Sequence, residues 1–246
     1  TQINRAGKEW KQYSMIVNIP DNKLVKFVFK PCAGDNNSLS GYDCKKADNV
    51  VYWFDKVTLE PTDEAGPGEG EEPATELVKN GSFEKDFAAD KQPGIYAAWQ
   101  TQGNNTLNFL DMWFAKPDVT NPSLSIDTST GANGSNRSLK YTAEKVDNTW
   151  GVDLSYPLQG VNPGKYELSF YAKTNQTESP FITSITLCEN NEDIAKEAKF
   201  QKAIVLQNGV QTIESGVNDI WGTVINQAGK EWKKYAVTVD IPTNVQ

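Results

Sequence analysis

The sequence contains no histidine among its 246 residues. Catalytic triads that use histidine as the base, and zinc sites with histidine ligands, are therefore excluded. Its three cysteines are too few for a disulfide framework; Cys32 and Cys44 either pair across a loop or remain free thiols, and Cys188 stands alone. No apolar run approaches about 18 residues, and no glycine-rich phosphate loop occurs, so neither a membrane span nor a nucleotide site is predicted.

Positive charge is also scarce. Lysine and arginine number 24 against 32 aspartates and glutamates, which gives a net charge of −8 and a pI of about 4.8. This balance argues against nucleic acid or an anionic membrane as a partner, and it leaves neutral and cationic ligands open. Aromatic residues, by contrast, are plentiful: seven Trp, nine Tyr and ten Phe. In so polar a chain we expect some of them to be exposed for binding.

A duplicated segment organises the chain. Residues 1–22 and 223–244 are identical at 14 of 22 aligned positions, so that Trp10 corresponds to Trp232. A repeat period of 222 residues indicates a duplicated domain rather than a solenoid. We therefore interpret residues 1–61 as the C-terminal part of one repeat and residues 76–246 as the N-terminal part of the next. Residues 62–75 are acidic, contain Pro and Gly and lack an apolar anchor, which predicts a linker.

Most of the chain has the two-residue hydrophobic period of a β-strand. The clearest case is residues 166–173, where apolar and polar side chains alternate strictly. Further strands are expected at 23–30, 50–59, 76–84, 123–127, 138–142, 150–156, 181–188 and 201–206, and in both copies of the duplicated segment. Many short strands between Gly, Pro and Asn turns predict an all-β fold, a jelly-roll β-sandwich of two antiparallel sheets.

Neither part of the chain holds a complete repeat, but together they supply every segment of one. Half a sandwich is not expected to be stable alone. The linker at 62–75 can reach tens of ångströms at about 3.3 Å per residue. We therefore expect the two parts to complete each other, either within one chain or between two chains as a strand-swapped homodimer. The alternative is a two-module protein of which this sequence holds only part of each module. The two copies of the duplicated segment would then compete for one place in the sandwich.

Five motifs stand in a consistent cyclic order: Asn80-Gly-Ser-Phe-Glu84, Ser138-Leu-Lys-Tyr141, Pro163-Gly-Lys-Tyr166, Trp232-Lys-Lys-Tyr235 and Trp53-Phe-Asp-Lys-Val-Thr-Leu59. In this order they resemble carbohydrate-binding modules of families 4 and 22, which are galactose-binding-like jelly rolls. Each motif is weak alone, but together they cover nearly the whole chain apart from the linker. The resemblance implies non-catalytic binding of xylan, β-glucan or a related plant polysaccharide along one face.

Modules of this kind occur in tandem on glycoside hydrolases, including xylanases of gut Bacteroidales. The resemblance therefore implies a secreted or cell-surface bacterial protein whose module directs an attached xylanase to its substrate. It also implies a structural Ca²⁺ held by the carboxylates of Glu84 and Asp55, with main-chain oxygens near Ser82 and Lys140. The alternative is that each carboxylate caps a turn or faces solvent.

Sugar binding needs a flat apolar surface for the C–H face of a pyranose, with polar groups within reach of its hydroxyls. Tyr171 is the best-placed aromatic residue, because it lies on a strand whose other face is clearly apolar. Glu167, Ser169 and Lys173 share its face and are candidates for hydrogen bonds to a sugar; the alternative for each is simple solvation.

Four tryptophans are further candidates for a stacking platform. Trp150 opens an expected strand, Trp99 and Trp113 lie in expected loops, and Trp53 points away from its neighbour Phe54. For each of them the alternative is a place in the core. Trp10 and Trp232 are repeated together with the strand framework, so we expect them to be structural.

Xylan is the first hypothesis for the ligand and β-glucan the second. Two other classes of function stay open. A glycosidase needs only a pair of carboxylates about 5–9.5 Å apart in a groove, and acidic residues are plentiful. A structural or adhesin sandwich would bury its tryptophans and have no aromatic cleft.

Overall fold

The computed structural model describes residues 24–31, 47–62, 76–96, 109–117, 119–146, 154–158, 161, 164–177, 179–188, 202–207, 210–215 and 224–241. The strands in these ranges are β1 (Leu24–Pro31), β2 (Ala47–Pro61), β3 (Gly94–Ile95), β4 (Phe114–Ala115), β5 (Ser123–Asp127), β6 (Ser138–Val146), β7 (Leu154–Leu158), β8 (Gly164–Thr174), β9 (Ser179–Cys188), β10 (Lys202–Gln207), β11 (Val210–Ser215), β12 (Val224–Ala228) and β13 (Lys233–Ile241). A short 3-10 helix, η2 (Ala89–Lys91), precedes β3. In the described part of the chain, no helix is long and apolar enough to cross a membrane.

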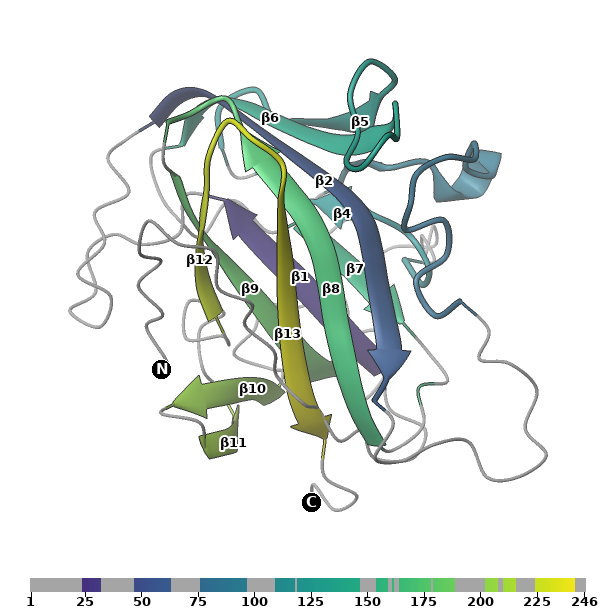
Figure 1. The fold of residues 1–246 in the computed structure, drawn as a ribbon, viewed down its shortest axis with the longest axis vertical. Coiled ribbons are helices and arrows are strands. Elements are labelled where there is room, and N and C mark those ends of the chain that lie inside the picture. The colour runs from purple at the N-terminus through teal and green to yellow at the C-terminus, as the bar shows by residue number, and fades with distance from the viewer. Residues whose placement is uncertain are drawn as a thin grey trace.

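The strands form two sheets that pack face to face (Figure 1). The eight-stranded sheet has the order β11-β10-β9-β1-β7-β4-β3, with β12 also paired to β9, and the five-stranded sheet has the order β13-β8-β2-β6-β5. The strand pairings are antiparallel except that of β3 with β4. The prediction of an all-β sandwich is confirmed. From β6 to β9 the chain crosses to the other sheet at every step, in keeping with the predicted jelly roll.

The first two strands lie in the middle of the two sheets rather than at their edges. β1 lies between β7 and β9, so that Phe27 is opposite both Tyr156 and Ile185. β2 lies between β6 and β8, so that Phe54 is opposite both Leu139 and Ala172. Within this one chain, the segments before and after residues 63–75 therefore share both sheets. Residues 63–75 themselves, which make up most of the predicted linker, lie outside the described residues.

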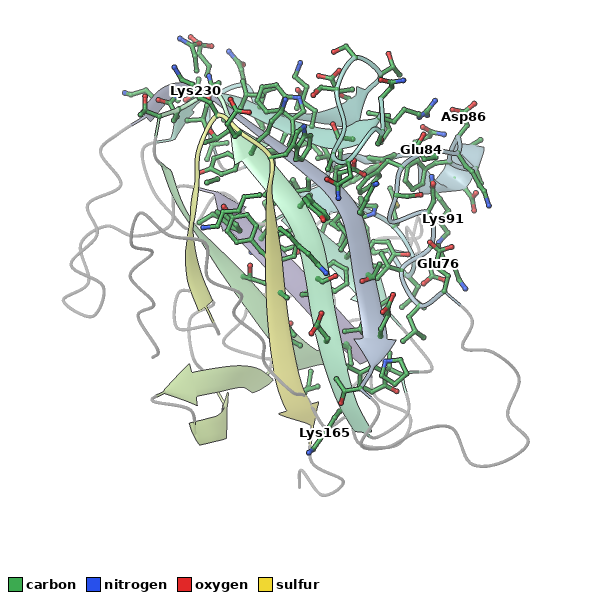
Figure 2. All side chains as sticks on the ribbon, in the orientation of Figure 1. Glu76, Glu84, Asp86, Lys91, Lys165 and Lys230 are labelled. Atoms are coloured by element: carbon green, nitrogen blue, oxygen red, sulfur yellow. The ribbon has the colours of Figure 1, made fainter. Side chains whose placement is uncertain are left out.

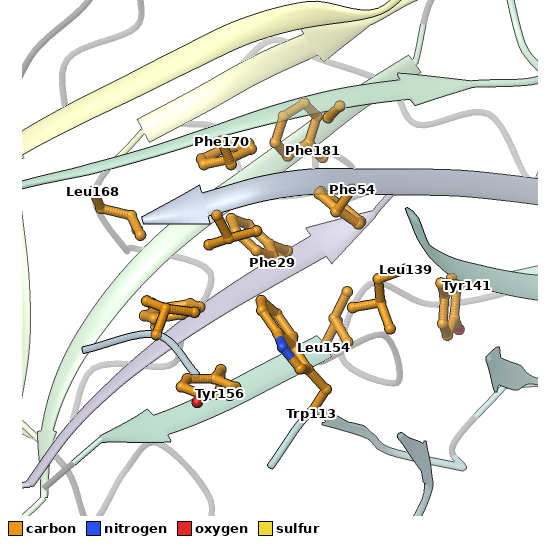
Figure 3. Close-up of a cluster of buried hydrophobic side chains, with 14 of the residues drawn as sticks. Phe29, Phe54, Trp113, Leu139, Tyr141, Leu154, Tyr156, Leu168, Phe170 and Phe181 are labelled. Carbon is orange, nitrogen blue, oxygen red and sulfur yellow. The ribbon is translucent and has the colours of Figure 1, made fainter. Parts of the chain in front are cut away.

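The core between the sheets is predominantly aromatic (Figure 3). Phe29 of β1 faces Phe54 of β2 and Phe170 of β8, with ring centroids 4.6 and 4.5 Å apart. All residues from Val25 to Phe29 are buried, as the nearly unbroken apolar run of this strand predicts for a strand covered by a facing sheet. These contacts join strands from distant parts of the sequence and hold the two sheets together.

The segment at 76–84 corrects one expectation, since it forms a turn and not a short strand. The carbonyl of Gly81 accepts a hydrogen bond of 2.9 Å from the N–H of Val57 in β2. A Cβ at position 81 would lie only 2.0 Å from the carbonyl oxygen of Val57, so only glycine fits there. Asn80, with a φ of 52°, uses the left-handed conformation that asparagine tolerates in turns. The Asn-Gly pair therefore fastens this turn to β2.

The second copy of the duplicated segment forms β12 and β13. β12 pairs with β9 in one sheet and β13 pairs with β8 in the other, so this ribbon joins the two sheets at one side (Figure 1). Tyr235 is buried and stacks on Phe170 with ring centroids 5.5 Å apart. The first copy, including Trp10, lies outside the described residues.

Candidate functional site

The outward face of the five-stranded sheet carries several of the predicted ligand-binding residues. Trp53 of β2 and Lys173 of β8 are only partly buried, whereas Phe54 is fully buried, because successive residues of a strand point to opposite faces. The register places Trp53 opposite Lys140 of β6 on one side and opposite Lys173 on the other. We call these three residues, together with Trp232 just before β13, the Trp53 row.

Trp53 is held in place from β5 through Asp127. The indole Nε1 of Trp53 donates a 2.9 Å hydrogen bond to Asp127 Oδ2, and Lys140 Nζ lies 3.4 Å from the same oxygen. The backbone N–H and the hydroxyl of Ser129 donate to Oδ1 at 2.9 and 2.6 Å. Burial by itself raises the pKa of Asp127, but the hydrogen bonds from Ser129 and Trp53 outweigh it and hold this pKa well below its usual range. Asp127 is therefore a charged anchor for the edge of the indole ring.

Lys173 lies between two tryptophans. Its Nζ is 5.0 Å from the ring centroid of Trp53 and 5.0 Å from that of Trp232, and it donates a 2.7 Å hydrogen bond to Thr130 Oγ1. An ammonium group over an indole face is attracted by the negative potential of the ring. Burial lowers the pKa of Lys173, and the nearby negative charge of Asp127 partly opposes this shift. The row thus combines two indole rings with two ammonium groups at the surface.

Trp232, which the sequence predicts to be structural, lies half-buried against Lys173 on the outward face, and its role stays a prediction. A sequence signal was available: Trp232 and the buried Tyr235 are three residues apart, so in an extended chain they point to opposite faces. The row lies near the end of the sheet where the turn between β12 and β13 carries Lys230, far from Lys165 at the start of β8 (Figure 2).

Tyr171 is partly covered by the loop at 128–137. Its hydroxyl accepts a 2.7 Å hydrogen bond from Asn133 Nδ2 of this loop. Ser169, the next outward residue along β8, is buried and forms a 3.0 Å hydrogen bond with Thr58. The polar group of each residue therefore already has a partner within the protein.

Glu167 lies outside the Trp53 row. It is six residues from Lys173 along β8, or about 20 Å at the usual rise of a strand. Its cross-strand neighbours are Glu60 on β2 and Thr238 on β13. A ligand would have to extend along the sheet to contact both Glu167 and Trp53.

Trp113 is a correction to the expectation of an exposed platform. It has 0% exposed surface and packs in the core against Phe27, Phe83 and Tyr156. It precedes the two-residue strand β4, and its ring points between the sheets (Figure 3). Trp99 and Trp150 lie outside the described residues, so their roles stay predictions.

The two carboxylates predicted to hold Ca²⁺ meet at Ser135. Asp55 has no exposed surface, although it occupies an outward position, because the loop at 128–137 covers it. Its carboxylate accepts 2.7 Å hydrogen bonds from the backbone N–H groups of Ala132 and Lys56, and the Ser135 side chain lies close enough to help lower its pKa. Burial raises the pKa of Asp55, and these hydrogen bonds oppose the shift. Ser135 bonds to Glu84, on the segment that precedes η2 (Figure 2).

Oxygen acceptors exceed donors around Ser135. Its hydroxyl has one hydrogen but two acceptors, the carboxylate of Glu84 and the carbonyl of Arg137 at 2.8 Å, and the carboxylate of Asp55 lies close by. Such a surplus of oxygens fits the ligand preference of Ca²⁺. Within the described ranges, no three acidic or thiol side chains cluster into a metal site, so a cation here would need hydroxyl and main-chain oxygens as well.

Main-chain oxygens near Ser82 and Lys140 were the other predicted ligands, and these two residues lie in the turn at 76–84 and in β6. Ser82 is half-buried in the turn next to Phe83, whose carbonyl accepts a hydrogen bond from Arg137 Nε. Lys140 lies in the ladder between β5 and β2, and its side chain belongs to the Trp53 row. The arrangement thus brings Asp55 and Glu84 together, with Ser135 and Arg137 as residues that the sequence did not single out.

A shallow, open hollow of about 370 Å³ continues the face beside the Trp53 row. It is lined by Asn49, Val50, Val51, Asn121, Thr142, Ala143 and Glu144. Val51 of β2 and Thr142 of β6 are paired with each other, and each is two residues from the paired Trp53 and Lys140. The hollow therefore lies next to the row on the same face. Asn121 donates a hydrogen bond to Glu144 across it. Its hydroxyl and amide groups are of the kind that bind sugar hydroxyls.

Comparison with models of protein families, with curated proteins and with solved structures gives no match, so the chain is classified at the level of the β-sandwich.

Proposed function

We propose that this chain is a non-catalytic module that binds β-linked plant polysaccharide, with xylan as the first candidate and β-glucan as the second. The observation that carries this proposal is the Trp53 row. A tryptophan on an outward sheet face is fixed by a charged hydrogen bond and flanked by two ammonium groups. An indole and hydrogen-bond donors on one face are what a pyranose requires. The motifs that resemble families 4 and 22 support the same ligand class.

The geometry favours shallow binding. The row and the adjoining hollow are open to solvent, and the hollow presents Thr142 and Asn121 to a ligand lying along the sheet. Several sugar units would each make few contacts, and the ordering of a flexible glycan opposes binding. We therefore expect modest affinity that rises with the number of sugar units.

We further propose a structural Ca²⁺ at Asp55 and Glu84, supported by the surplus of acceptors around Ser135. A bound cation would neutralise the buried charge of Asp55 and hold the loop at 128–137 over β2. This loop also carries Thr130, the hydrogen-bond partner of Lys173, and Asn133, the partner of Tyr171. Ca²⁺ should therefore raise the melting temperature, and EDTA should lower it. An unchanged melting temperature would contradict a structural Ca²⁺.

As for cellular context, we propose that the module is secreted or at the cell surface of a bacterium and directs an attached glycoside hydrolase, in the first place a xylanase, to its substrate. The support is the resemblance of the five motifs to tandem modules of such enzymes.

The test is isothermal titration calorimetry with xylohexaose and cellohexaose in the presence of Ca²⁺, on the wild type and on Trp53→Ala and Tyr171→Ala. We expect xylohexaose binding that Trp53→Ala weakens about fivefold to tenfold, since one stacked ring contributes roughly 1–1.4 kcal/mol. Tyr171→Ala should weaken it less, because the loop already covers this ring in part.

Melting curves of the three proteins control for folding. Binding of cellohexaose alone would replace xylan by β-glucan. Absence of binding to either glycan would overturn both ligand proposals, and release of shorter sugars would make the protein an enzyme.

A further inference from the structure

The two ammonium groups of the Trp53 row differ in their charge partners. Lys140 Nζ lies 3.4 Å from the carboxylate of Asp127. Lys173 Nζ, by contrast, has the neutral hydroxyl of Thr130 and two indole rings around it, and among the described residues no carboxylate lies within 4.0 Å of it. An ammonium group has three N–H donors, and Thr130 uses one of them. Lys173 therefore offers both donors and positive charge to a ligand.

Asp127 compensates this charge only in part, because its oxygens already accept other hydrogen bonds and do not contact Lys173 directly. Oδ1 accepts two hydrogen bonds from Ser129, and Oδ2 accepts one from Trp53 and lies next to Lys140. Lys173 is also partly desolvated: burial lowers its pKa, and the more distant negative charges of Asp127 and Glu231 oppose this shift only in part. An anionic group on a bound ligand, in direct contact with Lys173, would complete this compensation.

A uronic acid combines the two features that this site recognises. Its pyranose ring can lie against an indole, and its carboxylate can accept charge-assisted hydrogen bonds from an adjacent ammonium group. We propose that Lys173 binds the carboxylate of a uronic-acid branch, so that the preferred ligand is an acidic xylan rather than an unsubstituted one. This inference rests on the proposed glycan-binding function.

The net charge of −8 does not oppose this assignment. At physiological salt, charges more than about 8 Å apart at a surface are largely screened. The charges next to the ligand therefore decide. Around the row these are the two lysines, Asp127, whose oxygens already accept hydrogen bonds, and Glu231 beside Trp232. The same screening predicts that the preference for an acidic branch weakens as salt is added.

The experiment compares two ligands that differ only in charge: a xylo-oligosaccharide with one glucuronic-acid branch, and the same oligosaccharide after reduction of its carboxylate to a primary alcohol. Both are titrated at low salt into the wild type, Lys173→Met and Lys173→Arg, with Lys234→Met as the matched control. Lys234 is an exposed lysine on the same face, opposite Tyr171. We expect the wild type to prefer the acidic ligand about tenfold, because charge-assisted hydrogen bonds are among the strong ones.

Lys173→Met should abolish the preference, so that the variant binds the acidic and the reduced ligand with equal affinity, whereas Lys173→Arg and Lys234→Met should keep the preference. Equal affinity of the wild type for both ligands would overturn the inference and leave the proposed function intact. A preference that survives Lys173→Met would place the carboxylate elsewhere and overturn the assignment. If the wild type binds neither of these ligands nor xylohexaose, the proposed function itself is overturned.

Discussion

The two faces of β2 use neighbouring residues in opposite ways. Tyr52 and Phe54 point inward, where Phe54 is surrounded by aromatic rings and has no exposed surface. Trp53 and Asp55 point outward, and each is held by hydrogen bonds to the chain around β5 and the following loop. Inward side chains are fixed by packing, whereas outward ones are fixed by polar contacts. One strand can therefore stabilise the sandwich on one face and present a binding surface on the other.

Substitutions on the inward and outward faces of β2 should therefore have different effects. Loss of an inward ring leaves a cavity in a closely packed core, which the whole fold must accommodate. Loss of an outward ring leaves a space that water fills. We therefore expect stability and glycan binding to respond to different residues of the same strand.

The largest effect is expected from Phe54→Ala. This substitution removes a ring that contacts Phe29 of the facing sheet, and it should lower the free energy of unfolding by about 3–5 kcal/mol. Urea denaturation followed by tryptophan fluorescence measures it. Trp53→Ala, one residue earlier, is the control and should cost only about 1 kcal/mol. Equal losses for both variants would contradict the division between the two faces.

Asp55→Ala comes next. The substitution leaves the buried N–H of Ala132 and the partly buried N–H of Lys56 without their carboxylate acceptor, which should cost about 1–3 kcal/mol. If Asp55 also binds Ca²⁺, the variant should lose the rise in melting temperature that Ca²⁺ gives the wild type. Ser123→Ala, a substitution on the exposed surface of β5, serves as the control. A Ca²⁺ response that persists in Asp55→Ala would place the cation elsewhere.

The pH dependence of stability should separate the two outward aspartates. The pKa of Asp127 is lowered in the folded state, so its contribution is present above the ordinary pKa of 3.8 and is lost as the pH falls below it. The pKa of Asp55 is raised, so its buried charge destabilises the fold at neutral pH and this cost is relieved on acidification. Asp127→Asn should therefore flatten the loss of stability at low pH, by about 1 kcal/mol for a partly exposed group.

Asp55→Asn should have the opposite effect and steepen the loss. Urea midpoints measured in EDTA between pH 7 and pH 3 give both slopes for the cation-free protein. A change of the same sign in the two variants would contradict the environments assigned to these carboxylates.

Sequence patterns could predict the faces of long strands but not the contacts between distant segments. Strict alternation in residues 166–173 correctly predicts that Phe170 is inward and Lys173 outward. Trp113 stands beside a strand of two residues, where no period exists, and its burial depends on β1 and β7 from elsewhere in the chain. Asp127 was missed because its partner Trp53 is 74 residues away.

The candidate cation site likewise contains residues that the sequence indicated and others that only the fold reveals. The motif resemblance pointed to Asp55 and Glu84, and the fold brings both to one hydroxyl. Ser135 and the carbonyl of Arg137 carry no signal in the sequence, since a serine in a polar loop is unremarkable and any residue has a carbonyl. The fold of the loop at 128–137 decides which oxygens meet.

Tyr171 gives the smallest expected effect, and it tests how far the loop limits the outward face. Tyr171→Phe keeps the ring but removes the acceptor of the hydrogen bond from Asn133. Because this bond is solvent-exposed, the variant should lose less than about 1 kcal/mol of stability.

If the loop only covers the ring, Tyr171→Phe and Asn133→Ala should bind glycan as the wild type does, within about twofold. If the loop instead limits access to the face, both variants should bind more tightly, because either change releases it. A marked loss of affinity in Tyr171→Phe alone would mean that the hydroxyl itself contacts sugar, and calorimetry with xylohexaose distinguishes the three results.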